Sequence, residues 1–315
     1  MRRFLALVIA LCAFCAATAD NLRGTGTLTE HKFKHKGVEY TYSVYIPQGL
    51  KEGAPLVMVL HGYGSKEVPV IKYGFNPIAD KEGFAICYPH GPKDDNNKIY
   101  WSIGYKYHIQ TGQMRDDVGF LVRLVEHLQK TYNLSKRNVF SAGNSNGGAM
   151  GYMLAYKRPE KFAAIASVSG HIMEYMYRRL EPKRAIPIME IHGTLDSLAR
   201  WNGDPFNNNL RGGDIAIPRV VGLWAAKNRC TYEETDTLPQ IRHKIIAHKY
   251  KGGTDGNEVW LYEIVNGKHS YAEKDMNTAA EIWKFLVMMQ KVALFGASNG
   301  REIYFSRSYF LAIFP

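Results

Sequence analysis

Short apolar runs alternate with segments of helical periodicity along most of the 315-residue chain. Residues 55–60 (PLVMVL) and 84–88 are continuously apolar, which is typical of strands that are buried on both faces of a sheet. Between such runs, the apolar residues of 118–132 recur at the three- and four-residue spacing of a helix. This alternation predicts an α/β fold with a mostly parallel central sheet and helices on both faces.

The other predicted elements follow the same alternation. An antiparallel pair of strands is expected first, over residues 27–33 and 40–47, because apolar side chains there alternate at period two. Further strands are expected over residues 139–142, 163–168, 186–191, 241–250 and 259–265, and helices over residues 146–158, 217–228 and 275–292. Neither an internal repeat nor a low-complexity linker interrupts this series, so we expect one domain over residues 20–292.

The N-terminus has the order of a secretory signal peptide. Arg2 and Arg3 precede the apolar run 4–14, and small residues follow it up to Ala17-Thr18-Ala19. We therefore expect residues 1–19 to be removed and the mature chain to be secreted or periplasmic. The tail 293–315 fits neither a strand nor a helix pattern, and its structure stays open.

Charge and cysteine content exclude some classes of protein. The net charge is +11, but there is neither a basic block nor a nucleic-acid motif, so we expect no nucleic-acid partner. Beyond the signal no apolar run reaches the roughly 18 residues of a membrane span, and we expect no membrane association. Cys87 and Cys230 remain after signal removal; free thiols are expected, with a disulfide as the alternative in an exported chain.

A glycine-flanked serine stands between a predicted strand and a predicted helix. Residues 143–147 read Gly-Asn-Ser-Asn-Gly and match the pattern G-x-S-x-G. In such a nucleophile elbow, a sharp turn exposes the serine hydroxyl at the N-terminus of the helix. We therefore predict Ser145 as a nucleophile; a plain glycine-rich turn is the alternative.

A serine nucleophile needs a base, and this kind of elbow has the chain order serine, acid, histidine. Three histidines beyond the serine are candidates for the base: His243, His248 and His269. His269 lies in a loop between the last predicted strand and the last helix, whereas His243 and His248 fall within a strand pattern. The loop can bring an imidazole over the edge of the sheet, so we predict His269 as the base.

The acid is sought in loops that follow parallel strands, where such sheets place their sites. Asp196 follows the strand 186–191 in this way, and Asp204 is the alternative. The acid would hold the tautomer of His269 and stabilise its imidazolium form.

The oxyanion hole is expected from backbone N–H groups of two loops. One is that of Asn146, directly after the serine, and the other is that of Tyr63, in the loop Leu60-His61-Gly62-Tyr63-Gly64. His61 and His192 each precede a glycine at the end of a strand, and we expect both to hold their loops by hydrogen bonds.

Metal and cofactor sites are not expected. Neither H-x-x-E-H nor C-x-x-C occurs, and His31 and His35 alternate with lysines on what reads as a solvated strand. There is also no glycine-rich loop for phosphate. Serine-based acyl transfer proceeds without a cofactor.

The motifs together resemble those of the polyhydroxybutyrate depolymerase and feruloyl esterase group of α/β-hydrolases, carbohydrate esterase family one. The likeness spans about residues 35–290 and rests on LHGYG (60–64), YPHG (88–91), DDVGF (116–120), GNSNGGAM (143–150), HGTLD (192–196) and NGKHSY (266–271). The acid loop SLARWNGD (197–204) and the histidine loop KHSY (268–271) depart from the usual pattern, which leaves the substrate open.

The resemblance implies an α/β-hydrolase fold and a secreted serine esterase with Ser145, Asp196 and His269 as its triad. We expect a feruloyl or acetyl xylan esterase that acts on esters of plant cell-wall polysaccharide. A polyhydroxyalkanoate depolymerase or a serine peptidase is the alternative among enzymes. A non-catalytic carbohydrate-binding protein on the same scaffold is the alternative of another class. The oligomeric state stays open.

Aromatic side chains near the predicted site can stack on a phenolic acyl group or a sugar. Trp201 and Tyr271 lie near the predicted acid and base in the sequence, and Trp101 lies in a loop. We expect these three side chains as substrate contacts, with core packing as the alternative for each.

Overall fold

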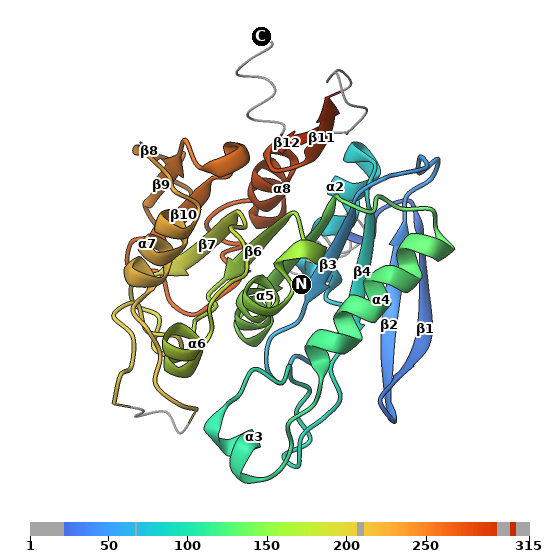
Figure 1. The fold of residues 1–315 in the computed structure, drawn as a ribbon, viewed down its shortest axis with the longest axis horizontal. Coiled ribbons are helices and arrows are strands. Elements are labelled where there is room, and N and C mark those ends of the chain that lie inside the picture. The colour runs from blue at the N-terminus through green and yellow to red at the C-terminus, as the bar shows by residue number, and fades with distance from the viewer. Residues whose placement is uncertain (1–21, 67, 207–210, 295–302, 307–315) are drawn as a thin grey trace, which may run out of the picture.

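A ten-stranded sheet runs through the protein, seen in a computed structural model that describes residues 22–66, 68–206, 211–294 and 303–306 (Figure 1). The strand order is β1 (Thr27–His35), β2 (Val38–Ile46), β4 (Ala85–His90), β3 (Leu56–Leu60), β5 (Val139–Asn144), β6 (Ala164–Val168), β7 (Ile188–Gly193), β10 (Val259–Ile264), β9 (Ile245–Lys251) and β8 (Tyr232–Thr237). The six strands from β4 to β10 run parallel, and antiparallel strands extend both edges. The predicted mostly parallel sheet is confirmed.

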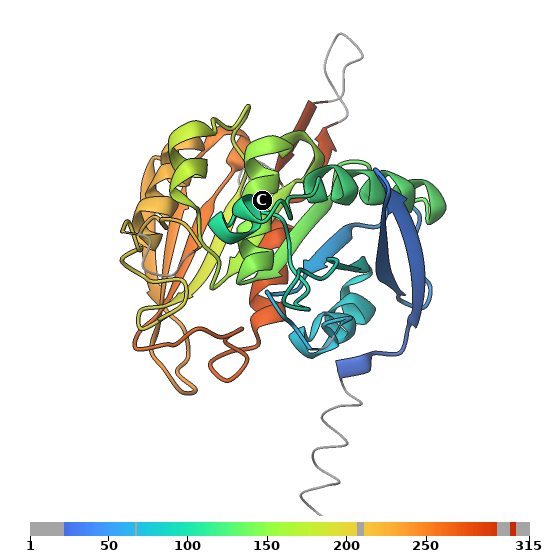
Figure 2. The same cartoon turned by 90° about the horizontal axis from the view of Figure 1, so that it is seen from below.

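Helices pack on both faces of this sheet (Figures 1 and 2). One face is covered by α4 (Asp117–Thr131), α5 (Asn146–Lys157), α6 (Glu174–Arg179) and α7 (Ile217–Lys227). The other face is covered by α2 (Phe75–Glu82) and α8 (Thr278–Met288). The short helix α3 (Lys106–Gln110) and the 3₁₀ turns η1 (Ile71–Tyr73), η2 (Pro159–Lys161) and η3 (Thr254–Gly256) complete the connections.

Strand β3 shows why the continuous apolar runs are needed. Leu56, Met58 and Leu60 point into the core under α4 and α5. Val57 and Val59 point into the core under α2 and α8. Because successive side chains of a strand alternate between the faces, a strand with helices on both sides buries every residue.

The predicted elements agree with the observed ones apart from their ends. Asp116 caps α4 by accepting a hydrogen bond from the Gly119 N–H at 2.9 Å. The last predicted helix is shorter than expected, since α8 ends at Met288. Strand β11 (Lys291–Leu294) then pairs with β12 (Ile303–Ser306), so the proposed domain boundary at residue 292 falls inside β11.

Several elements were not predicted from the sequence. The edge strand β8 is the clearest case, because every one of its residues is exposed and its sequence, YEETDT, has no apolar alternation. Its backbone pairs with β9, and Lys251 of β9 forms an ion pair with Glu234 at 2.5 Å. Helices α2, α3 and α6 are short, which leaves too few apolar positions to define a period.

The cysteines and the N-terminus can be placed against their predictions. Cys87 is buried in β4 and Cys230 follows α7; both are free thiols, as predicted. The predicted signal, residues 1–19, lies outside the described residues. Within the described part of the chain, none of the helices has the length and apolar character to cross a membrane.

The fully buried His61 ties together the loops that follow β3 and β4. Its Nε2 accepts a hydrogen bond from the Gly91 N–H at 2.9 Å, and its Nδ1 donates to the Gly62 carbonyl at 2.9 Å. The ring also stacks on Trp101, with centroids 4.8 Å apart. The predicted role in holding the loop is therefore confirmed. Burial lowers the pKa of His61 to about 4, so the folded protein keeps this ring neutral.

We expect His61→Gln to reduce the loss of stability in acid. Below pH 6.5 His61 becomes protonated in the unfolded chain, whereas in the folded chain it stays neutral down to about pH 4. Wild-type stability should therefore fall by about 1.4 kcal/mol per pH unit more than that of the variant. Urea unfolding at pH 5.0, 6.0 and 7.0 measures the difference. Between pH 7.5 and 8.5 the two curves should run parallel, and parallel curves in acid as well would contradict the prediction.

Candidate active site

Ser145 stands at the sharp turn between β5 and α5. Its backbone has φ 53° and ψ −116°, a conformation that a residue with a side chain adopts only when its surroundings enforce it. The Ser145 N–H donates to the Val168 carbonyl at 2.8 Å, which fixes the turn against β6. The serine therefore lies at the carboxyl end of a central parallel strand and at the N-terminus of a helix.

The glycines of the motif are required by close packing around this turn. A Cβ atom on Gly147 would lie 2.5 Å from the Leu60 carbonyl oxygen at the end of β3. A Cβ atom on Gly143 would lie 2.4 Å from the backbone of Gly147. Real Cβ atoms do not approach backbone atoms so closely, so α5 can start against β3 and β5 only with glycine at both positions.

Asp196 and His269 are joined directly. His269 Nδ1 lies 2.7 Å from Asp196 Oδ2. The other carboxylate oxygen, Oδ1, accepts hydrogen bonds from the N–H groups of Leu198 and Ala199, both at 2.8 Å. The Asp196 side chain is fully buried, whereas 18% of the His269 side chain is exposed. A buried, ordered carboxylate thus holds one nitrogen of a partly exposed imidazole.

Backbone contacts bring these two loops together at the ends of β7 and β10. The Leu195 N–H donates to the Gly267 carbonyl at 2.8 Å, and the Thr194 N–H donates to the Ile264 carbonyl at 3.0 Å. A Cβ atom on Gly193 would meet the Gly267 oxygen at 2.3 Å, so this close approach requires glycine. The separation of the acid and the base is therefore set by two neighbouring parallel strands.

The electrostatics keep Asp196 ionised. Burial alone raises the pKa of a carboxyl group, but the hydrogen bond to His269 and the electrostatic attraction of the His269 and His192 rings outweigh it and hold the pKa of Asp196 below its usual range. A carboxylate in this state can stabilise positive charge on the imidazole.

Ser145 and His269 line one cavity of about 940 Å³. Gly62 and Tyr63 follow β3 and line it too, as does Leu198, which follows β7. All of these residues lie in segments that follow the carboxyl ends of parallel strands, so the cavity opens at the carboxyl edge of the sheet. This is the edge at which open α/β sheets place their ligands.

Tyrosines dominate the wall of this cavity. The lining includes Tyr63, Tyr73, Tyr105, Tyr107 and Tyr271, together with His108, Lys72, Arg211 and Glu273. Tyr271, expected as a substrate contact, does line the cavity, and its ring stacks on Tyr73 with centroids 3.9 Å apart. Tyr63 was predicted only for its backbone N–H. Tyr73, at the end of η1, and Tyr105 and Tyr107, at the start of α3, were not singled out, because no common motif marks them in the sequence.

The two predicted tryptophan contacts do not line the cavity. Trp101 is fully buried, and its indole N–H donates to the His61 carbonyl at 3.0 Å. Trp201 packs against the core with its ring 6.2 Å from that of His192. The prediction of a substrate contact is wrong for Trp101, because its side chain is fully buried. Trp201 packs against the core, which was the alternative for this residue.

The predicted oxyanion donors belong to the loop after β3 and to the first residue of α5. Tyr63 lines the cavity, and its hydroxyl donates to Asp94 at 2.5 Å, which holds the loop in place. Asn146 is the first residue of α5, where a backbone N–H has no partner within the helix. Its side-chain amide pairs with both backbone groups of Trp101, at 2.6 and 3.0 Å, and so orients the residue.

The alternative acid and bases lie elsewhere. Asp204 is buried, and its backbone pairs with that of Asp214. His243 precedes β9 and lies 2.8 Å from Asp275. His248 is on the surface of β9, as expected, between Glu233 at 2.9 Å and Glu263 at 3.3 Å. None of these residues lines the cavity.

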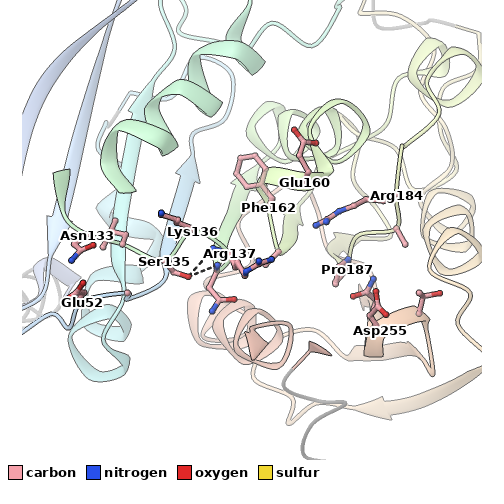
Figure 3. Close-up of a pocket in the computed structure, with 17 residues that line it drawn as sticks. Glu52, Asn133, Ser135, Lys136, Arg137, Glu160, Phe162, Arg184, Pro187 and Asp255 are labelled. Atoms are coloured by element: carbon pink, nitrogen blue, oxygen red, sulfur yellow. Dashed lines mark hydrogen bonds between the residues drawn. The ribbon is translucent and has the colours of Figure 1, made fainter. Parts of the chain in front are cut away.

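A larger cavity, of about 1040 Å³, lies at the opposite edge of the sheet (Figure 3). Its lining residues Asn138, Ala163 and Pro187 directly precede β5, β6 and β7, so this is the amino edge of the parallel strands. Lys136, Arg184 and other charged side chains form its wall, and none of the predicted site residues does. In the described ranges, no group of three or more His, Cys, Asp or Glu side chains is arranged to hold a metal ion.

Comparisons with known proteins agree with this architecture. The chain is similar to the bifunctional acetylxylan esterase/xylanase XynS20E of Neocallimastix patriciarum, with 26% identity over 56% of this chain and 24% of the relative. It is 30% identical to feruloyl esterase B of Neurospora crassa over 40% of this chain and 42% of the relative. The chain thus spans less than half the length of these two relatives.

Among solved structures, the acetyl xylan esterase from Aspergillus awamori superposes with a TM-score of 0.57 at 16% identity, covering 83% of this chain and 99% of that one. This likeness shows that the fold is that of the α/β-hydrolases. The sequence profile described as "Esterase PHB depolymerase" matches residues 40–197, which is half of the chain and includes both the serine turn and Asp196. The chain belongs to the esterase PHB depolymerase family.

Proposed function

We propose that this protein is a serine esterase in which Ser145, His269 and Asp196 form the catalytic triad. The observation that carries the proposal is the 2.7 Å hydrogen bond between Asp196 and His269, whose ring lines the same cavity as Ser145. Membership of an esterase family supports the same reaction. The positive φ of Ser145 adds to this support, because such strain concentrates at functional residues.

The proposed reaction passes through an acyl-enzyme. Ser145 Oγ attacks the ester carbonyl while His269 Nε2 takes its proton, since Nδ1 is held by Asp196. The backbone N–H groups of Tyr63 and Asn146 would stabilise the negative charge on the carbonyl oxygen. His269 then gives the proton to the leaving alcohol, and a water molecule repeats the cycle to release the acid.

The substrate class is proposed from the cavity wall and from the relatives. Five tyrosine rings suit a flat phenolic acyl group, because aromatic rings stack and the tyrosine hydroxyl groups bind polar substituents. The similarity to feruloyl and acetylxylan esterases favours feruloyl or acetyl esters of plant xylan. Because the polysaccharide lies outside the cell, we also propose that the chain is secreted after cleavage following Ala19; mass spectrometry of the exported protein tests this cleavage.

The family description also names polyhydroxybutyrate depolymerases, which hydrolyse a polyester. A panel of methyl ferulate, acetylated xylan and hydroxybutyrate oligomers separates the candidates. Highest kcat/KM on methyl ferulate supports the aromatic pocket. Highest kcat/KM on hydroxybutyrate oligomers would replace the xylan assignment while leaving the triad in place. A peptidase would be recognised by cleavage of peptide substrates instead.

Ser145→Ala should abolish turnover of nitrophenyl acetate while leaving the fold intact, with a loss on the order of 10⁴-fold or more. Asp196→Asn should lose roughly 10⁴-fold, because an amide favours the wrong tautomer of His269. Steady-state kinetics and circular dichroism measure these effects. Asp204→Asn is the matched control and should retain most of the activity. A Ser145→Ala variant with wild-type turnover would remove this serine from the mechanism.

Tyr107→Ala should discriminate between aromatic and small acyl groups. The Tyr107 ring lines the cavity, and one lost aromatic contact is worth about 0.5–1.5 kcal/mol, or roughly a 2- to 12-fold change. We expect kcat/KM to fall by this factor for methyl ferulate and to stay near the wild-type value for nitrophenyl acetate. Tyr107→Phe, which keeps the ring, is the control. An equal fall on both esters would argue against stacking at this position.

A further inference from the structure

A glutamate lies in the middle of an otherwise apolar central strand. Glu190 of β7 is fully buried between parallel strands on both sides. A carboxylate in such a place is very costly unless partners satisfy both of its oxygens. Neither the proposed reaction nor the packing of the core explains why it is there.

Both oxygens of Glu190 do have partners. Oε1 lies 2.7 Å from Nδ1 of His192, which is also fully buried and points to the same face of β7 two residues later. Oε2 accepts a hydrogen bond from the Tyr152 hydroxyl at 2.8 Å. Tyr152 belongs to α5, the helix that starts directly after Ser145. The glutamate therefore connects the helix behind the serine to the strand that leads to Asp196.

The second nitrogen of His192 faces the predicted acid. Nε2 lies 2.7 Å from the Ala199 carbonyl and 3.4 Å from Asp196 Oδ2. A carbonyl oxygen can only accept, so Nε2 must carry a proton. The proton between Nδ1 and Glu190 is then the one whose position decides the charge of the ring.

The surroundings favour placing that proton on His192. Burial lowers the pKa of the ring, but the hydrogen bond and charge of Glu190 and the charge of Asp196 outweigh it and raise the pKa of His192 above its usual value. Burial also raises the pKa of Glu190, so the two groups compete for the proton. The nearby Asp196 carboxylate favours the imidazolium. His171 and the ring of Trp201 also lie near His192, and Ser167 and Tyr152 face Glu190.

We propose that Glu190 and His192 are positioning residues of the active site, forming a buried ion pair that fixes the orientation and the charge of Asp196. The chain of contacts runs from Tyr152 through Glu190 and His192 to Asp196 and His269. It holds the acid loop, the base and the helix after the serine in one frame. This inference rests on the proposed function of Ser145, Asp196 and His269.

The state of the pair can be measured without any activity. In protein labelled with ¹⁵N-histidine, His192 should show two protonated ring nitrogens from pH 6 to pH 8, with the signals assigned by comparison with His192→Gln. In Glu190→Gln the ring should lose the Nδ1 proton. A neutral His192 ring at pH 7 in the wild-type chain would overturn the proposal.

The positioning role is tested at Ser145 itself. The rate of labelling by a fluorophosphonate reports how well His269 activates the serine, whatever the natural ester. Glu190→Gln should slow labelling by about 10- to 100-fold. This is the size of the effect at metal sites when a side chain that hydrogen-bonds to a metal ligand is lost. With nitrophenyl acetate kcat should fall and KM should stay.

Ile188→Val, on the same strand and also fully buried, is the matched control, since it perturbs packing without touching a charge. Should Glu190→Gln show no more effect than this control, the pair is only structural. Tyr152→Phe, which removes one hydrogen bond of Glu190 but keeps the ion pair, should slow labelling by less than Glu190→Gln does. If Ser145→Ala still reacts with the fluorophosphonate, the proposed function fails, whereas the His192 signals still decide the state of the pair.

Discussion

The hydrogen bond between Asp196 and His269 joins two loops that are 73 residues apart in the sequence. It exists because β7 and β10 are neighbours in the sheet and run parallel, so that both strands end at the same edge. Backbone bonds between the loops and the close approach of Gly193 to Gly267 then leave the two side chains little freedom. The geometry of the site is thus a consequence of how the sheet is ordered.

Buried charge accompanies this geometry. Asp196, Glu190 and His192 are all removed from water, yet each has hydrogen-bond partners at 2.7–2.8 Å. A network of this kind costs desolvation, but it excludes alternative arrangements of the loop once every member is satisfied. His61 plays a different part, as a neutral buried ring that holds the loop carrying Tyr63. The proposed triad is therefore surrounded by buried polar groups that hold its loops in place.

Much of the fold could be predicted because local periodicity reports which residues are buried. The apolar run of β3 and the helical spacing of α4 both show directly which of their residues are buried. The exposed strand β8 carries no such signal, because backbone pairing at a sheet edge places no demand on side-chain polarity. The sequence likewise does not show whether an aromatic side chain packs in the core or lines the cavity. Trp101 and Tyr107 both follow β4 along the chain, yet the first is buried under the site and the second lines it.

By itself, the sequence determined the alternation of strands and helices, the turn that carries Ser145 and the order of serine, acid and histidine along the chain. Only the tertiary structure decided which carboxylate meets His269, which rings form the cavity and why a glutamate lies inside β7. The physical reason is the distance along the chain over which each effect acts. Periodicity and turn chemistry act within a few residues, whereas the neighbours of a loop at the edge of a parallel sheet are set by the packing of the whole sheet.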